Sequence, residues 1–181
     1  MGAVRNICVF CGAAEGNRPV YAKTARALGQ AIAERGLCLV YGAGNVGLMG
    51  MLAESVLSSG GEVSGVIPEK LVDRELAHQG LTELHIVETM HDRKAKMHSL
   101  SDAYIALPGG IGTMEEFFEA VTWRQLGYHN KPVALLNVSG FYDGVDSFFT
   151  VMQRDGFLHS DHRKLFFIET DVVQLLDRLV S

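Results

Sequence analysis

The residues with the clearest chemical potential in this sequence form the run 108–116, Pro-Gly-Gly-Ile-Gly-Thr-Met-Glu-Glu. An apolar, strand-like segment at 103–107 precedes the run, and a helix-like segment at 115–126 follows it. Glycine has no Cβ, so the backbone here can come close to a ligand. A helix N-terminus directly behind such a loop offers free N–H groups and a positive dipole end, which suit a phosphate.

The two carboxylates of the run, Glu115 and Glu116, suit a different part of the ligand. A carboxylate repels a phosphate, so we expect them beside the group attached to the phosphate, such as a sugar. Glu116 also has a purely structural interpretation, because Thr113 and Glu116 fit the T-x-x-E pattern of a capping box. Spacing alone leaves capping and catalysis open, and one helix end can serve both.

A second group of candidates is the basic segment 90–97, which contains Arg93, Lys94 and Lys96. Cations in the first turns of a helix oppose its dipole, which Asp92 partly offsets. They form either a solvated face or an anion site. Because the segment lies one strand before the glycine run, both can meet at one sheet edge, where the planar fork of Arg93 would hold a phosphate or a sugar hydroxyl.

The segment 42–47 matches the G-x-G-x-x-G pattern of dinucleotide sites. The match is poor in context, because it follows the second expected strand rather than the first. Glu69, the nearest acidic partner for a ribose, stands behind Pro68. A tight turn that lets a helix pack against the sheet is the better interpretation, and a nicotinamide or flavin site is the weaker one.

The cysteines and histidines indicate neither redox nor metal chemistry. Cys8 and Cys11 form a C-x-x-C within a strand-like run, where residues three apart point to opposite faces. We therefore expect buried thiols rather than a redox or zinc pair. The seven histidines show no metal-binding spacing such as H-E-x-x-H, and we expect no metal and no cofactor.

Short apolar runs alternate with helix-like segments along the chain, which predicts right-handed βαβ units. The fold class is therefore α/β, with a Rossmann-like doubly wound parallel sheet of about seven strands in a single domain over residues 1–181. The expected strands are 6–11, 37–41, 62–67, 81–87, 103–107, 132–136 and 165–168, and the expected helices are 19–35, 48–57, 91–100, 115–126, 142–154 and 172–179. Ligands bind at the carboxyl edge of such sheets, where the loops 12–18, 42–50, 68–75 and 108–116 would lie.

Composition limits the function classes. The chain has 181 residues, 48% of them hydrophobic and 20% charged, as in a globular domain. A net charge of −5 argues against a nucleic-acid partner. No apolar stretch approaches the length of a membrane span, and the first residues do not resemble a signal peptide. We therefore expect a cytoplasmic protein that does not bind membranes.

These motifs together resemble the LONELY GUY (LOG) family of cytokinin riboside 5'-monophosphate phosphoribohydrolases. The family signature P-G-G-x-G-T-x-x-E stands at 108–116, and M-H-x-R-K stands at 90–94. Further matches are 41–50, 74–75, 122–123 and 131–133, so the similarity covers nearly the whole chain. The family has also been called lysine decarboxylases, but no lysine here stands out as a Schiff-base candidate.

The resemblance implies a Rossmann-like homodimer that hydrolyses the N-glycosidic bond of a nucleoside 5'-monophosphate. Cytokinin riboside monophosphates, which are N6-substituted AMP, and AMP itself are the expected substrates. Arg93 and Glu116 correspond to the residues that the family needs for activity. The implied substrate site consists of Glu75, Arg93, Lys94, Gly109, Gly110, Ile111, Gly112, Thr113, Met114, Glu115, Glu116 and Thr122.

The sequence departs from the family at two positions of these motifs. Ile111 replaces a tyrosine common in plant members, which affects substrate preference, and Ala43 replaces a usual glycine. A non-catalytic nucleotide carrier of the same fold, like the molybdenum-cofactor carriers, is the alternative function. Retention of both Arg93 and Glu116 favours the enzyme.

Overall fold

A parallel sheet forms the centre of the computed structural model, which describes residues 3–72 and 78–181. Its strand order is β4-β3-β2-β1-β5-β6-β7, and all neighbouring strands run parallel. The strands are β1 (Asn6–Phe10), β2 (Cys38–Tyr41), β3 (Glu62–Pro68), β4 (Glu83–Val87), β5 (Ala103–Ala106), β6 (Val133–Leu136) and β7 (Phe167–Glu169). The expected doubly wound α/β architecture is confirmed.

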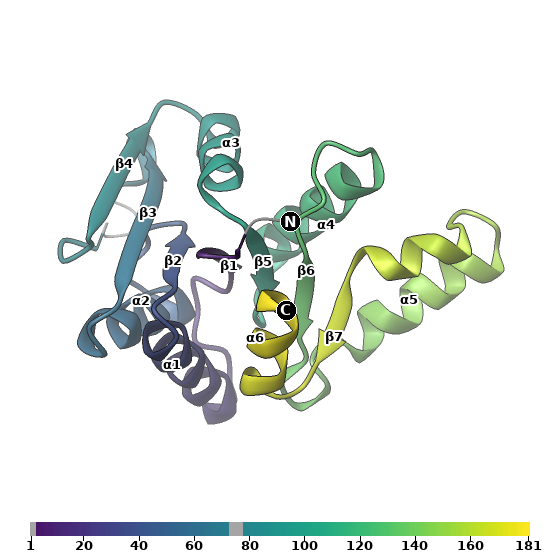
Figure 1. Ribbon diagram of the computed structural model, residues 1–181, viewed down its shortest axis with the longest axis horizontal. Helices are drawn as coiled ribbons and strands as arrows, with labels where there is room; N and C mark the ends of the chain where they lie inside the picture. The colour runs from purple at the N-terminus through teal and green to yellow at the C-terminus, as the bar shows by residue number, and fades with distance from the viewer. Residues whose placement is uncertain (1–2, 73–77) are drawn as a thin grey trace.

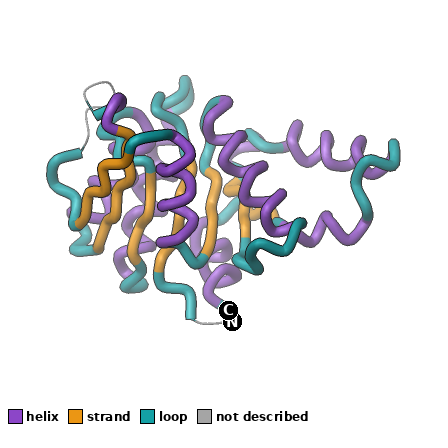
Figure 2. Tube along the Cα trace, turned by 90° about the horizontal axis from the view of Figure 1, so that it is seen from above, coloured by secondary structure: helices purple, strands orange, loops and turns teal. Residues whose placement is uncertain are grey.

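Helices cover both faces of the sheet (Figure 1). The helices are α1 (Pro19–Glu34), α2 (Gly47–Ser58), α3 (Met90–Leu100), α4 (Ile111–Gln125), α5 (Asp143–Arg154) and α6 (Val172–Val180), with short 3-10 turns η1 (Glu69–Leu71), η2 (Val138–Gly140) and η3 (Ser160–Leu165). Helices α1, α2 and α6 pack on one face, and α3, α4 and α5 pack on the other. Helix α5 extends beyond the sheet edge at β7 (Figure 2).

The sheet separates two buried cores, one on each face, and alternate residues along a strand contribute to each core. Along β1, Ile7 and Val9 belong to the core beneath α1 and α2, whereas Cys8 and Phe10 belong to the other. Cys11, just after the strand, returns to the first core. Both thiols are free and buried on opposite faces, as the strand period predicts.

The start of α4 differs from the sequence-based prediction. The helix begins at Ile111, four residues before the expected start, and Gly110 occupies the N-cap position. Thr113 and Glu116 therefore lie inside the helix, and the capping-box interpretation of this pair is wrong. Glu116 stands on the second turn, where its side chain is not needed to close the helix end.

The strand order reverses its direction between β1 and β5. Strands β2 to β4 extend the sheet from one side of β1, and β5 to β7 extend it from the other. Beyond these two strands the chain leads to α1 on one face and to α4 on the other, which leaves a crevice at the carboxyl edge. The glycine run lies there, because its loop follows β5.

Among the described helices, none is both long and apolar enough to cross a membrane.

Candidate active site

The loops after β1 and β5 form the floor of a cleft at the reversal point. Gly12 N–H donates to the Pro108 carbonyl at 3.1 Å, and Leu48 N–H donates to the Gly12 carbonyl at 3.1 Å. These bonds join both loops to the start of α2. The cleft holds about 250 Å³ and is lined by Cys11, Gly12, Ala13, Met49, Met90, Arg93, Gly110, Gly112, Thr113, Glu115 and Glu116.

The glycines of the loop divide into two kinds. A Cβ on Gly109 would lie 2.1 Å from the Thr113 hydroxyl, so this position must be glycine for the loop to fold against α4. A Cβ on Gly110 or Gly112 would meet nothing within 4 Å. That space lies beside the first N–H groups of α4, where a phosphate is favoured.

Arg93 enters the cleft from the first turn of α3 and is only 6% exposed. Its Nε donates to the Val66 carbonyl at 3.1 Å, and its Nη2 donates to the Gly42 carbonyl at 2.8 Å. A Cβ on Gly42 would lie 1.8 Å from Nη2. The first glycine of the G-x-G-x-x-G pattern therefore makes room for this arginine, and Gly47, with φ +60°, packs against the Ala13 backbone.

A capping box closes the N-terminus of α3 and supports Arg93. Thr89 Oγ1 accepts from Asp92 N–H at 3.1 Å, and the Asp92 carboxylate accepts from Thr89 N–H at 3.1 Å. This reciprocal pair satisfies two N–H groups at the helix end. The Asp92 carboxylate also offsets the cations of the same turn.

Glu116 lies on the opposite wall of the cleft, where its side chain is half-buried. Burial raises the pKa of Glu116 to about 7; Arg93 and Lys94 act against the shift, while Glu115 and Glu119 add to it. A carboxyl group with such a pKa changes its protonation state near neutrality. It is therefore able to act in acid–base or charge-stabilising chemistry at physiological pH.

The other predicted site residues differ in how close they lie to the cleft. Lys94 lies beside the cleft, bonded to Glu115 at 2.5 Å and to Glu119 at 2.8 Å. Ile111 is 90% exposed at the lip, and Met114 packs against the core beneath α4. Thr122 is exposed on a later turn of α4. Glu75 lies outside the described residues.

Several residues that line the cleft are not among the site residues predicted from the sequence. Cys11, Gly12, Ala13, Met49 and Met90 line it, although the loop positions of most of them mark the right sheet edge. Glu119, which bonds to Lys94, carried no motif signal of its own. The pairing becomes visible only when α3 and α4 are placed side by side.

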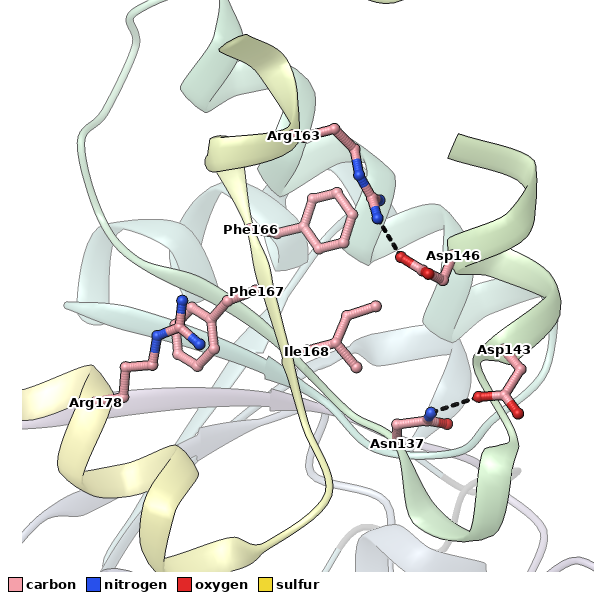
Figure 3. Close-up of a pocket in the computed structure, with 8 residues that line it drawn as sticks. All are labelled: Asn137, Asp143, Asp146, Arg163, Phe166, Phe167, Ile168 and Arg178. Atoms are coloured by element: carbon pink, nitrogen blue, oxygen red, sulfur yellow. Dashed lines mark hydrogen bonds and ion pairs between the residues drawn. The ribbon is translucent and has the colours of Figure 1, made fainter. Parts of the chain in front are cut away.

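A second hollow lies along β7 at the far end of the sheet (Figure 3). Its charged groups are already paired: Arg163 binds Asp146, Asn137 donates to Asp143 at 2.7 Å, and Arg178 binds Glu169 at 2.8 Å. The Arg163 guanidinium also lies over the Phe166 ring. These contacts hold α5 and α6 to the sheet edge, and none of the described glycines lines this hollow, in contrast to the first cleft.

Comparison with known proteins finds relatives over nearly the whole chain. Residues 49–179 match a family model described as possible lysine decarboxylase. The chain is 48% identical over 178 residues to a probable cytokinin riboside 5'-monophosphate phosphoribohydrolase of Oryza sativa subsp. japonica, covering 98% of this chain and 80% of that protein. It is 46% identical over 175 residues to a cytokinin riboside 5'-monophosphate phosphoribohydrolase of Arabidopsis thaliana, covering 97% and 82%.

Solved structures share the fold at lower sequence identity. A molybdenum cofactor binding protein from Rippkaea orientalis superposes with a TM-score of 0.74 at 22% identity, over 100% of both chains. A Moco carrier protein from Chlamydomonas reinhardtii gives 0.73 at 21% identity, over 97% of both chains. At these identities the likeness extends to the fold alone.

Proposed function

The chain belongs to the LONELY GUY (LOG) family of cytokinin riboside 5'-monophosphate phosphoribohydrolases, and we propose that it hydrolyses the N-glycosidic bond of N6-substituted AMP. The products are the free base and ribose 5-phosphate. Unsubstituted AMP is a second substrate of the same reaction. The single observation that carries this proposal is the position of Glu116 in one cleft with Arg93 and the glycine loop.

The glycine loop is the proposed phosphate site. Gly110 and Gly112 leave open space beside the first turn of α4, so the phosphate oxygens can reach its N–H groups. Glu115 and Glu116 then lie farther along the helix, beyond the phosphate. This order supports a ribose, rather than the phosphate, next to the carboxylates.

Glu116 is the proposed catalytic carboxylate. Cleavage of the glycosidic bond builds positive charge on the ribose, as in an oxocarbenium ion. An ionised Glu116 stabilises that charge, either directly or by orienting a water molecule or a ribose hydroxyl. Arg93 holds the phosphate or ribose, and its positive charge favours the ionised form of Glu116.

The remaining site residues take supporting roles in this proposal. Lys94 and Glu115 form an ion pair at the edge of the cleft. Thr122 lies nine positions after Thr113 on α4, about 14 Å along the helix axis. Thr122 is therefore too far from the glycine loop to contact a phosphate held there, and we assign it to the site of a partner copy in a homodimer.

Two wider expectations belong to the same proposal. The single continuous sheet supports one domain over residues 1–181. All three cysteines are free thiols, which supports a cytoplasmic location, because thiols stay reduced there. The carrier alternative is supported only by likeness of fold.

The direct test is incubation of the protein with isopentenyl-AMP and, separately, with AMP, followed by chromatography for free base and ribose 5-phosphate. We expect both products from at least the N6-substituted nucleotide. Glu116→Gln should lower the rate about 10²-fold or more while the protein remains folded. Release of neither base by the wild-type protein would reject the hydrolase, and near-normal turnover by folded Glu116→Gln would reject the role of Glu116.

A further inference from the structure

Four side chains form a ladder between α3 and α4. Lys94 and His98 lie four residues apart on α3, and Glu115 and Glu119 lie four residues apart on α4, so each pair shares one helix face. Lys94 Nζ binds Glu115 Oε1 at 2.5 Å and Glu119 Oε2 at 2.8 Å. His98 Nε2 lies 3.5 Å from the other oxygen of Glu119, Oε1.

The outer end of the ladder is fixed by Tyr104 on β5. His98 Nδ1 lies 2.7 Å from the Tyr104 hydroxyl. Burial raises the pKa of Tyr104, so its hydroxyl keeps its proton and can donate it to Nδ1. The proton of neutral His98 then resides on Nε2, facing Glu119. The opposite tautomer would turn a bare nitrogen lone pair toward a carboxylate.

The ladder is shielded from solvent. The side chains of Lys94, His98 and Glu119 are 12%, 9% and 20% exposed. Glu119 Oε1 is buried and makes no hydrogen bond within the described residues. His98 Nε2, 3.5 Å away, is the donor that faces it. A charge pair of this kind brings a desolvation cost that offsets much of its attraction. We therefore attribute to the Lys94–Glu119 pair a role in fixing geometry rather than in adding stability.

The ladder lies directly beside the cleft. Arg93 precedes Lys94 on α3, and Glu116 follows Glu115 on α4. We propose that Glu119 is a positioning residue that acts through Lys94 and Glu115 to fix the first turns of α3 and α4 relative to each other, and so sets Arg93 against Glu116. This inference rests on the proposed function, and it assigns Glu119 no contact with the substrate.

The first test compares Glu119→Ala with a matched control, Glu169→Ala. Glu169 binds Arg178 at 2.8 Å and is 22% exposed, so the control removes a carboxylate of similar burial from an ion pair of the same length at β7. We expect Glu119→Ala to lower kcat for isopentenyl-AMP about 10- to 100-fold, as for a small misplacement of reacting groups. Its KM should rise by a smaller factor than kcat falls, and Glu169→Ala should keep the wild-type kcat. An unchanged kcat in Glu119→Ala would overturn the proposal.

The second test is a double-mutant cycle between Glu119→Ala and Lys94→Ala, which asks whether Glu119 acts through Lys94. If it does, the double variant is no slower than the slower single variant, because the two changes break the same link. Independent, multiplicative losses of kcat would overturn the proposal.

Binding separates this proposal from the proposed function. A wild-type protein that releases no base would reject the hydrolase. The role of Glu119 is then decided by calorimetric titration with AMP: we expect the affinity of Glu119→Ala to fall, because Arg93 is displaced, while Glu169→Ala binds as the wild type does. Equal dissociation constants for wild type and Glu119→Ala, or a wild type that binds no AMP, would overturn the positioning role.

Discussion

The Gly42 carbonyl accepts a 2.8 Å hydrogen bond from Arg93 Nη2, and a Cβ on Gly42 would lie 1.8 Å from that same nitrogen. The guanidinium thus occupies the place where any other residue would carry its side chain. Gly42 opens the segment that looks like a dinucleotide fingerprint, and Arg93 stands at the basic start of α3. Together they place a buried arginine beside the cleft.

Gly42→Ala should therefore lower activity as the loss of Arg93 would. The new methyl group displaces the guanidinium, and we expect kcat/KM for isopentenyl-AMP to fall about 10²-fold or more, since misplacement of about 1 Å has that effect. Gly144→Ala is the control, because a Cβ there meets nothing within 4 Å. Wild-type kinetics in Gly42→Ala would contradict this role for the glycine.

Gly112→Ala tests the phosphate site without disturbing the fold. A Cβ at this position meets no protein atom within 4 Å, so the variant should unfold at the wild-type temperature. The methyl group instead occupies the space proposed for the phosphate. We expect the dissociation constant of ribose 5-phosphate, measured by calorimetry, to rise about 10-fold or more, as for the loss of charge-assisted hydrogen bonds. An unchanged constant would place the phosphate elsewhere.

The pH dependence of kcat/KM should report the titration of Glu116. Burial raises its pKa to about 7, and the charged neighbours are Arg93, Glu115, Lys94 and Glu119. If the carboxylate is the active form, the rate rises with pH through about 7. Lys94→Met removes a cation that lowers this pKa, so the rising limb should move to higher pH, while Lys164→Met at the distant η3 should leave it in place.

The same titration affects folding. The folded-state pKa of Glu116 is about 7 and its ordinary value is 4.5, so the folded protein holds a proton between these values that the unfolded chain releases. The contribution to stability is present below pH 4.5 and is lost as the pH rises through 7. At pH 8, Glu116→Gln should exceed the wild type in unfolding free energy by about 2 to 3 kcal/mol. Denaturant titrations at pH 4.5 and pH 8 measure the difference, which should shrink at the lower pH.

Much of the fold follows from short-range patterns in the sequence. Each of the seven expected strands is present. The central strands β5 and β6 are continuously apolar runs, which suit a parallel sheet buried on both faces, whereas the edge strand β4 is mostly exposed. Helix boundaries depend on finer detail. The sequence predicts the start of α4 four residues too late, since Gly110 and Gly112 look like loop residues although the helix already includes Gly112.

The site is only partly visible in the sequence. The P-G-G-x-G-T motif and Arg93 mark two walls of the cleft, but the spacing of Glu119 and His98 has meaning only once α3 and α4 are known to face each other. The same applies to Gly42, whose need for a bare Cα arises from a side chain 51 residues later in the chain. Contacts over such separations depend on topology, which local patterns do not specify.

The acceptors that hold Arg93 are the main-chain carbonyls of Gly42 and Val66. Every amino acid supplies such an atom, so substitution at position 66 cannot delete its acceptor. Of the two acceptor positions, only position 42 is sensitive to added bulk, because a Cβ there would meet the guanidinium. The two acceptors are thus insulated from mutational drift of their own side chains, and residues such as Val66 can vary without removing the hydrogen bonds that hold the guanidinium.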